Sequence, residues 1–271
     1  MDTKTEIMGA VVLGIVLVGL VLWYMNENPA PYVRTPQDAT NDINTGTEGS
    51  PVSLNETAAY YEIVASYPSA TTLKASAGAN ADRAAVELMR QFEADSIATF
   101  KKEGNFENLS HDDVQILGLD QRKMSLEIRY EGKKAPHTLS YLYTTHADTH
   151  GAHPNTYFRT FTFDTKTGAS LTLKDLFVPG TEYLSVVSVH ARKQLVDSIA
   201  AREGVKASQV DVEYLNRGTV PSSDNFQNWY LEGHTLILIF PPYQVAPYAA
   251  GVQTVIIQLS QLATILNPAY K

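Results

Sequence analysis

The chain has 271 residues, a formal net charge of −8 and no cysteine. The acidic balance and the lack of any long basic run argue against nucleic acid as a partner. Because cysteine is absent, the chain has no disulfide, no thiolate metal site and no cysteine nucleophile.

The first hydrophobic segment, residues 7–25, contains no charged side chain. As a helix it would reach roughly 28 Å, close to the ~30 Å hydrocarbon thickness of a bilayer. Trp23 and Tyr24 close the segment, where amphipathic rings suit the headgroup boundary. A cleaved signal peptide is the alternative, but its apolar core usually has ~7 to 15 residues and a cleavage site of small residues. The pattern therefore favours an uncleaved transmembrane anchor.

The residues around this segment predict its orientation and the organisation of the chain. Lys4 precedes it and Glu27 follows it, which by the positive-inside rule places the N-terminus in the cytoplasm. The stretch after it is rich in Asn, Thr, Pro, Gly and Asp and cannot bury enough apolar surface to fold. We expect four parts: a cytoplasmic stub (1–6), an anchor (7–25), a flexible linker (26–56) and an extracytoplasmic domain (57–271) of one unit or two subdomains (57–120 and 121–271).

The first half of the soluble part predicts a sheet with one long helix. Residues 60–67 have strand composition and end at a proline. Residues 81–102 place apolar side chains at three- and four-residue steps, which is typical of an amphipathic helix packed on a sheet. Period-two alternation then predicts antiparallel strands at 123–131, 138–145 and 157–164.

The second half repeats the mixture. A helix is expected at 181–203, followed by a hairpin of strands at 225–232 and 235–240. A last strand at 252–258 and a short helix at 259–266 complete the chain. Strands joined by hairpins, with helices between them, predict an α+β fold with a largely antiparallel sheet and packed helices.

Three segments together resemble a known domain. They are GAHPN at residues 151–155, LTLKDLF at 171–177 and PYQVAPYAAG at 242–251. The combination is similar to a bacterial envelope domain of unknown function, which occurs in the extracytoplasmic part of lysozyme-sensing anti-sigma factors and beside peptidoglycan deacetylase domains. The resemblance covers about residues 60–266 and implies an α+β module that recognises a protein or the cell wall. It does not carry over anti-sigma activity, because residues 1–6 are too short to form a sigma-binding domain.

Two loops supply the candidate binding residues. The loop at 241–251 combines prolines, which stiffen it, with tyrosines, which offer flat amphipathic contact area. The loop at 146–157 contains the GAHPN segment. The candidates are His153, Asn155, Tyr157, Tyr243 and Tyr248. The alternative is structural: His153 and Asn155 would fix a turn through backbone hydrogen bonds, and the tyrosines would pack on the core.

The same region contains four potential metal ligands within eight residues, namely His146, Asp148, His150 and His153. Neutral imidazole and carboxylate suit zinc, and alternate residues of a strand point to one side. A solvated, histidine-containing loop is the alternative. No Gly-x-Ser-x-Gly elbow, phosphate loop or dinucleotide fingerprint is present, so no catalytic residue is assigned.

These patterns favour a membrane-anchored, extracytoplasmic recognition module of the bacterial cell envelope. It would bind a protein or a peptidoglycan-type ligand without catalysis, and the membrane through its N-terminal helix. The alternative is a metal-dependent hydrolase of cell-wall polymer that uses His146, His150 and His153, with zinc as its cofactor. The first interpretation needs no cofactor.

Overall fold

The computed structural model describes residues 50–271, which form an α+β fold. The expected anchor and residues 26–49 of the expected linker therefore lie outside the described residues. Within residues 50–271, no helix is both long enough and apolar enough to cross a membrane.

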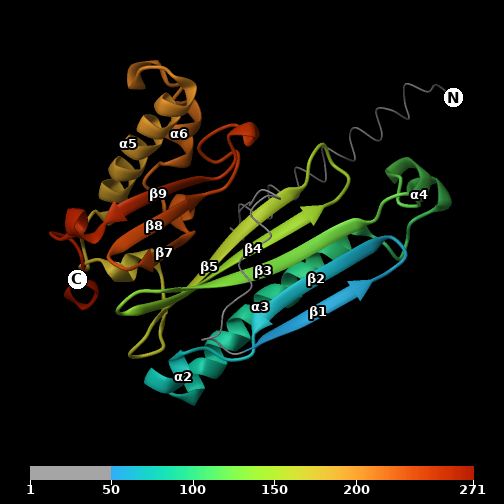
Figure 1. Cartoon of the computed structure of the whole chain (residues 1–271), viewed down its shortest axis with the longest axis horizontal. Helices are drawn as coiled ribbons and strands as arrows, with labels where there is room; N and C mark the ends of the chain where they lie inside the picture. The colour runs from blue at the N-terminus through green and yellow to red at the C-terminus, as the bar shows by residue number, and fades with distance from the viewer. Residues whose placement is uncertain (1–49) are drawn as a thin grey trace.

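A six-stranded sheet forms the long body of the molecule (Figure 1). Its strands lie side by side in chain order: β1 (Pro51–Thr57), β2 (Tyr61–Pro68), β3 (Met124–Lys134), β4 (Thr138–Asp148), β5 (Asn155–Asp164) and β6 (Ser170–Leu171). Neighbouring strands are antiparallel except β2 and β3, which are parallel. The parallel pair follows from the long helical crossover between these two strands.

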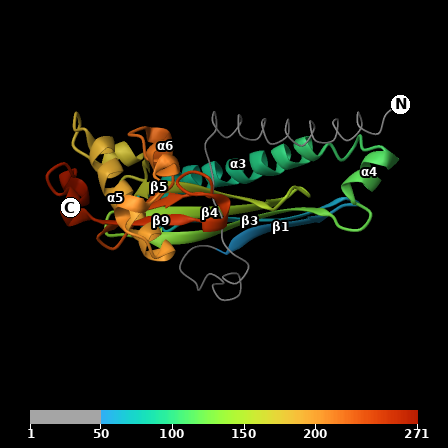
Figure 2. The ribbon, with the colours of Figure 1, turned by 90° about the horizontal axis from the view of Figure 1, so that it is seen from above.

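That crossover contains α2 (Leu73–Ser76), α3 (Ala79–Gly104) and α4 (His111–Leu117). The helix α3 lies along one face of the sheet, as Figures 1 and 2 show. Its apolar stripe faces the strands as predicted: Met89 is fully buried, and the ring of Phe92 meets the ring of Tyr143 edge-on, with centroids 5.2 Å apart.

A second, three-stranded antiparallel sheet consists of β7 (Trp229–Glu232), β8 (Thr235–Phe240) and β9 (Gln253–Gln258). The helix α5 (Tyr183–Glu203) packs on it through Val187, Ala191 and Leu195. The short helix α6 (Glu213–Gly218) follows. Single 3₁₀ turns complete the unit: η2 (Leu173–Leu176), η3 (Ala207–Gln209), η4 (Ser223–Phe226), η5 (Tyr248–Ala250), η6 (Leu259–Leu262) and η7 (Pro268–Tyr270).

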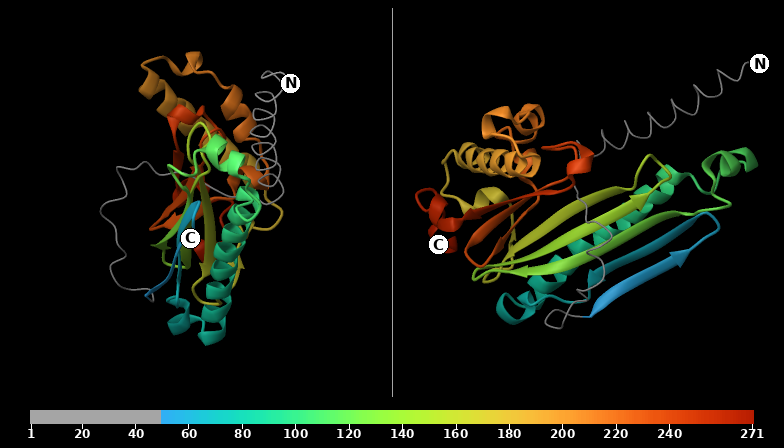
Figure 3. Two further views of the ribbon diagram at one scale, coloured as in Figure 1. Left: turned by 90° about the vertical axis from the view of Figure 1, so that its right-hand side faces the viewer. Right: turned by 45° about the horizontal axis from the view of Figure 1, so that its top comes forward.

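The two sheets meet at one end of the long sheet (Figure 3). Because strand side chains alternate in direction, Tyr141 and Tyr143 of β4 face α3, whereas Leu142 faces the opposite side. On that opposite side Leu142 and Phe158 pack against Tyr230 and against Ile237 and Ile239 of β8. The small sheet therefore covers only one end of the face that α3 leaves open.

Two of the expected domain boundaries differ from the structure. Residues 51–56, expected within the linker, are part of β1. The expected subdomain boundary at residue 120 cuts through one sheet, because Ile63 of β2 pairs with Leu126 of β3. The hydrophobic clusters divide the chain differently, into a core drawn from residues 63–163 and another drawn from residues 173–270.

Candidate functional site

Three of the predicted binding residues meet on the surface. The rings of His153 and Tyr248 stack with centroids 3.6 Å apart and planes inclined by 13°. The ring of Tyr243 lies 6.0 Å from that of His153 and 5.5 Å from that of Tyr248. We call His153, Tyr243 and Tyr248 the ring cluster. It joins the loop between β4 and β5 to the loop between β8 and β9, and thus links the two sheets.

Hydrogen bonds fix the arrangement of the ring cluster. The Nε2 atom of His153 lies 3.0 Å from the hydroxyl of Tyr243, and its Nδ1 atom lies 3.1 Å from the carbonyl oxygen of Pro154. A carbonyl can only accept, so Nδ1 donates and, in the neutral imidazole, Nε2 accepts from the Tyr243 hydroxyl. The Tyr248 hydroxyl donates to the same carbonyl at 3.3 Å. Both ring nitrogens of His153 are therefore engaged.

A strained turn presents Tyr243. The Gln244 amide donates to the carbonyl of Pro241 at 3.1 Å, which closes a four-residue turn with Pro242 at its second position. Tyr243 at the third position has φ +71°, which is the conformation that glycine normally supplies in a type II turn. A non-glycine residue there is disfavoured by roughly 1–2 kcal/mol. Yet the Tyr243 side chain is 51% exposed, so burial of its ring does not explain the strain.

The rest of the loop is held firmly. Val245 and Ala246 are buried in the core of the small sheet. The side-chain amide of Gln244 donates to the carbonyl of Gly218 at 3.0 Å and to that of Asn225 at 2.9 Å. A Cβ atom at Gly218 would lie 2.0 Å from the backbone oxygen of Gln244, so only glycine allows this approach. The ring cluster thus rests on a rigid base.

Sequence reasoning missed this base. Gln244 stands within the PYQVAPYAAG segment, but nothing in the segment indicates that its side chain reaches α6. Gly218 carries no local signal, because its close approach is to a residue 26 positions away.

The other two binding candidates do not join the ring cluster. Tyr157 of β5 packs among the side chains beneath α3, and burial raises its pKa to about 12. Asn155, two residues earlier in β5, shares that face of the sheet and is half-buried.

The potential metal ligands have separate partners. The Nδ1 atom of His146 lies 2.6 Å from the hydroxyl of Thr156, and burial lowers the pKa of this histidine. Asp148 forms an ion pair with Arg122 at 2.5 Å. His150 has φ +60°, and its Nδ1 donates to a carbonyl oxygen of α4, that of Leu117, at 2.7 Å.

The expected four-ligand cluster is therefore not assembled. The strand β4 ends at Asp148, so His150, with its left-handed backbone, lies beyond the strand. Its ring therefore turns toward α4 and does not continue the side-chain alternation of His146 and Asp148. His153 is held by the two tyrosines. Among residues 50–271, no group of three or more His, Asp or Glu side chains is placed to hold a metal ion.

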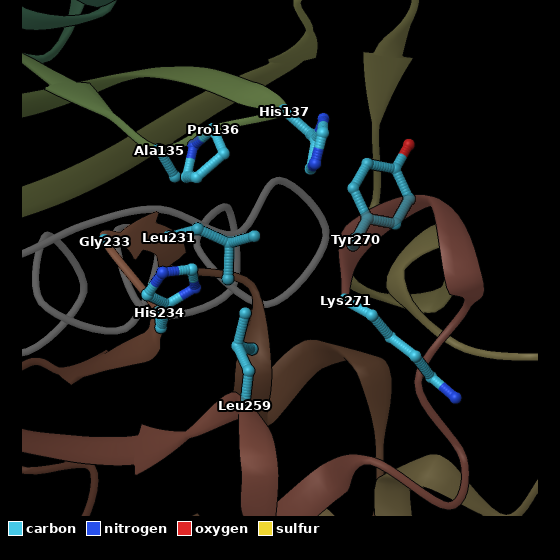
Figure 4. Close-up of a pocket in the computed structure, with 9 residues that line it drawn as sticks. All are labelled: Ala135, Pro136, His137, Leu231, Gly233, His234, Leu259, Tyr270 and Lys271. Carbon is cyan, nitrogen blue, oxygen red and sulfur yellow. The ribbon is translucent and has the colours of Figure 1, made fainter.

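Two hollows lie elsewhere on the molecule. One, shown in Figure 4, has a volume of about 10 Å³ and lies between Pro136 and His137 of the β3–β4 turn, His234 of the β7–β8 turn and Tyr270. It has room for about one water molecule. The other is open, has a volume of about 500 Å³ and lies along α5 beside Pro221. Neither includes a residue of the ring cluster, in which Tyr243 is exposed and His153 and Tyr248 are partly buried.

The comparisons with known proteins agree with the expected resemblance. Residues 174–260 match the family model described as "Protein of unknown function (DUF3298)". The peptidoglycan-N-acetylmuramic acid deacetylase PdaC of Bacillus subtilis (strain 168) is 32% identical over 120 residues, which make up 44% of this chain and 24% of that protein. The match thus spans about a quarter of the deacetylase.

Two solved structures share the fold. A DUF3298 family protein from Pseudomonas aeruginosa PAO1 has a TM-score of 0.50 at 13% identity, with 82% of this chain and 94% of that chain covered. A member of the same family from Bacteroides fragilis NCTC 9343 has a TM-score of 0.50 at 18% identity, with coverage of 84% and 96%. The expected resemblance to a domain of unknown function is confirmed: residues 174–260 of this chain match the DUF3298 family model.

Proposed function

We propose that this protein is a membrane-anchored recognition module of the bacterial cell envelope, which binds a protein or a peptidoglycan-type ligand through the ring cluster without catalysis. One observation carries the proposal. His153 and Tyr243, which are 90 positions apart in the chain, meet at 3.0 Å on the surface together with Tyr248.

The exposed strain at Tyr243 supports binding over a purely structural role. A ring that only fastened two loops together would gain most from being buried, whereas this side chain is 51% exposed. Backbone strain that persists at an exposed side chain is typical of binding sites. Tyrosine rings also offer a large contact area with few rotatable bonds, so little conformational entropy is lost when a ligand binds.

The composition of the ring cluster favours recognition over bond cleavage. It contains one imidazole and two phenols, and no carboxylate or primary hydroxyl that would act as a nucleophile. Both nitrogens of His153 already take part in hydrogen bonds. A base held in this way presents no free lone pair to a substrate.

Two features support the envelope location. Residues 7–25 have the length and composition of a membrane span. The 32% identical relative is named as a peptidoglycan deacetylase, and the region it shares with this chain makes up 24% of that enzyme. A module of this kind would hold the protein, or a domain joined to it, against the cell wall.

The test measures binding of the full chain to two materials. The chain is sedimented with purified peptidoglycan and, separately, used to pull down proteins from an envelope extract. We expect binding in one assay that falls at least tenfold in His153→Ala, Tyr243→Ala and Tyr248→Ala. Tyr214→Ala is the matched control, because this partly exposed tyrosine of α6 lies outside the ring cluster. Undiminished binding by all three variants would refute the site, and no binding in either assay would refute the function.

A further inference from the structure

The strand β1 forms an open edge of the six-stranded sheet. It stands last in the strand order and pairs with β2 alone (Figure 1). Six of its seven residues are exposed. In the described part of the chain, no further strand or helix pairs with its outer side.

The direction of its backbone groups can be read from the bonds at its two ends. The Ser69 amide donates to the carbonyl of Ser50, and the Ala58 amide donates to the carbonyl of Tyr61. Hydrogen-bonded pairs alternate along an antiparallel ladder, so the even-numbered residues of β1 bond to β2. The amides and carbonyls of the odd-numbered residues Ser53, Asn55 and Thr57 therefore point outward.

This edge has few of the features that usually prevent strand pairing, because its proline, Pro51, stands at the first residue of the strand and removes a single outward amide. Residues 51–55 carry no charge, and the strand has no bulge in its register with β2. Val52 and Leu54 are each 39% exposed. The single charge, on Glu56, is compensated within the fold, because Lys101 binds its carboxylate at 2.7 Å and Tyr61 donates to it at 2.5 Å. These two hydrogen bonds lower the pKa of Glu56.

We propose that β1 pairs antiparallel with β1 of a second copy of this chain, about a two-fold axis at Leu54. In this register Ser53 lies opposite the partner's Asn55, and their outward amides and carbonyls bond to each other. Leu54 lies opposite the partner's Leu54, so two exposed apolar side chains cover one another. The two sheets become one continuous sheet, and both open edges are closed in a symmetric, self-limiting interface.

A second copy fits this edge for two reasons. The register places no like charges opposite each other, since Glu56 lies opposite the partner's Val52. The position of β1 in the chain also matters, because it directly follows the expected anchor and linker. The proposal rests here on the proposed membrane anchor, which would place both copies on the same membrane surface. Their Pro51 residues would be ~20 Å apart, a distance that two such linkers can span. Sharing a surface raises the effective concentration enough for a small interface to form.

The absence of cysteine makes the pairing directly testable. In the proposed register Leu54 is in a non-hydrogen-bonded pair, where Cα atoms are about 4.5 Å apart, within the range of disulfide geometry. We expect the full-length Leu54→Cys variant, in membranes and with diamide as oxidant, to form a disulfide-linked dimer on a non-reducing gel. The Val64→Cys variant is the matched control, because Val64 is 43% exposed but lies on β2. Its copies would be three strand spacings apart, roughly 14 Å, and should not crosslink.

A second variant separates pairing from random collision. Asn55→Pro, added to Leu54→Cys, removes an outward amide while the bonds between β1 and β2 remain. We expect at least a tenfold loss of crosslinked dimer with an unchanged melting temperature, whereas Asn55→Thr in the same background retains the dimer. The proposal is overturned if Leu54→Cys fails to crosslink, if Val64→Cys crosslinks equally, or if the proline leaves the yield unchanged. Ligand binding by the ring cluster is measured separately, so the two proposals can fail independently.

Discussion

The strained turn at Tyr243 yields a prediction with an unusual sign. Exchanging alanine for glycine normally lowers stability by roughly 0.5–1 kcal/mol, because glycine has more freedom in the unfolded chain. At φ +71° the order should reverse, since alanine keeps the Cβ atom that makes this conformation unfavourable. Both substitutions remove the ring and its hydrogen bond to His153. The difference between Tyr243→Gly and Tyr243→Ala therefore isolates the backbone strain.

The expected size follows from two opposing effects. Relief of the left-handed strain favours glycine by roughly 1–2 kcal/mol, and its unfolded-state entropy opposes this by roughly 0.5–1 kcal/mol. We expect Tyr243→Gly to be more stable than Tyr243→Ala by about 0.5–1 kcal/mol, measured by urea unfolding of both variants. Both should lose ligand binding equally. If the alanine variant is the more stable, the turn does not store strain, and backbone strain gives no support for a binding role of Tyr243.

Three further predictions concern the support of the site and the two cores. Gly218→Ala should destabilise the protein by about 1–3 kcal/mol in urea unfolding and weaken ligand binding, because its Cβ would press on the carbonyl of Gln244. Burial raises the pKa of Glu93, so the folded state favours the protonated form, and stability should fall as pH rises above 4.5. In Glu93→Gln this fall should be absent when the melting temperature is measured across pH. Burial alone would raise the pKa of Asp164, but hydrogen bonds from Thr167 and others hold it below 3.8. The ionised carboxylate therefore stabilises the folded state, and the wild type loses this stabilisation as pH falls below 3.8. Asp164→Ala should lower the free energy of unfolding by about 1–3 kcal/mol at pH 7.

Much of the fold was predictable because its signals are local. The ladder between β3 and β4 follows two alternating segments joined by a short turn, and the apolar stripe of α3 follows its three- and four-residue spacing. The strand β1 has no such signal. It is an edge strand with both faces largely exposed, so its sequence PVSLNET is polar enough to resemble a linker.

The long-range contacts were beyond local patterns. Ile63 pairs with Leu126 across a helical crossover, which placed the expected subdomain boundary inside a sheet. The direction of the His150 ring could not be predicted from local patterns either. A strand-like alternation would aim its ring beside His146, but its left-handed backbone turns the ring to the carbonyl of Leu117 instead. The sequence predicted binding residues in both loops of the ring cluster but did not indicate that the loops touch.

The residues of the ring cluster come from two different parts of the fold. Tyr243 and Tyr248 lie inside the matched family region at 174–260, whereas His153 lies outside it, on the long sheet. The hydrogen bond from Tyr243 to His153 and the stacking on Tyr248 therefore depend on both sheets being folded and docked. A protein with only the small sheet would have the tyrosine loop without its imidazole. The proposed recognition by the complete ring cluster thus requires the two-sheet unit, and the docking face of Leu142 and Phe158 is as necessary to the geometry of the cluster as the loops themselves.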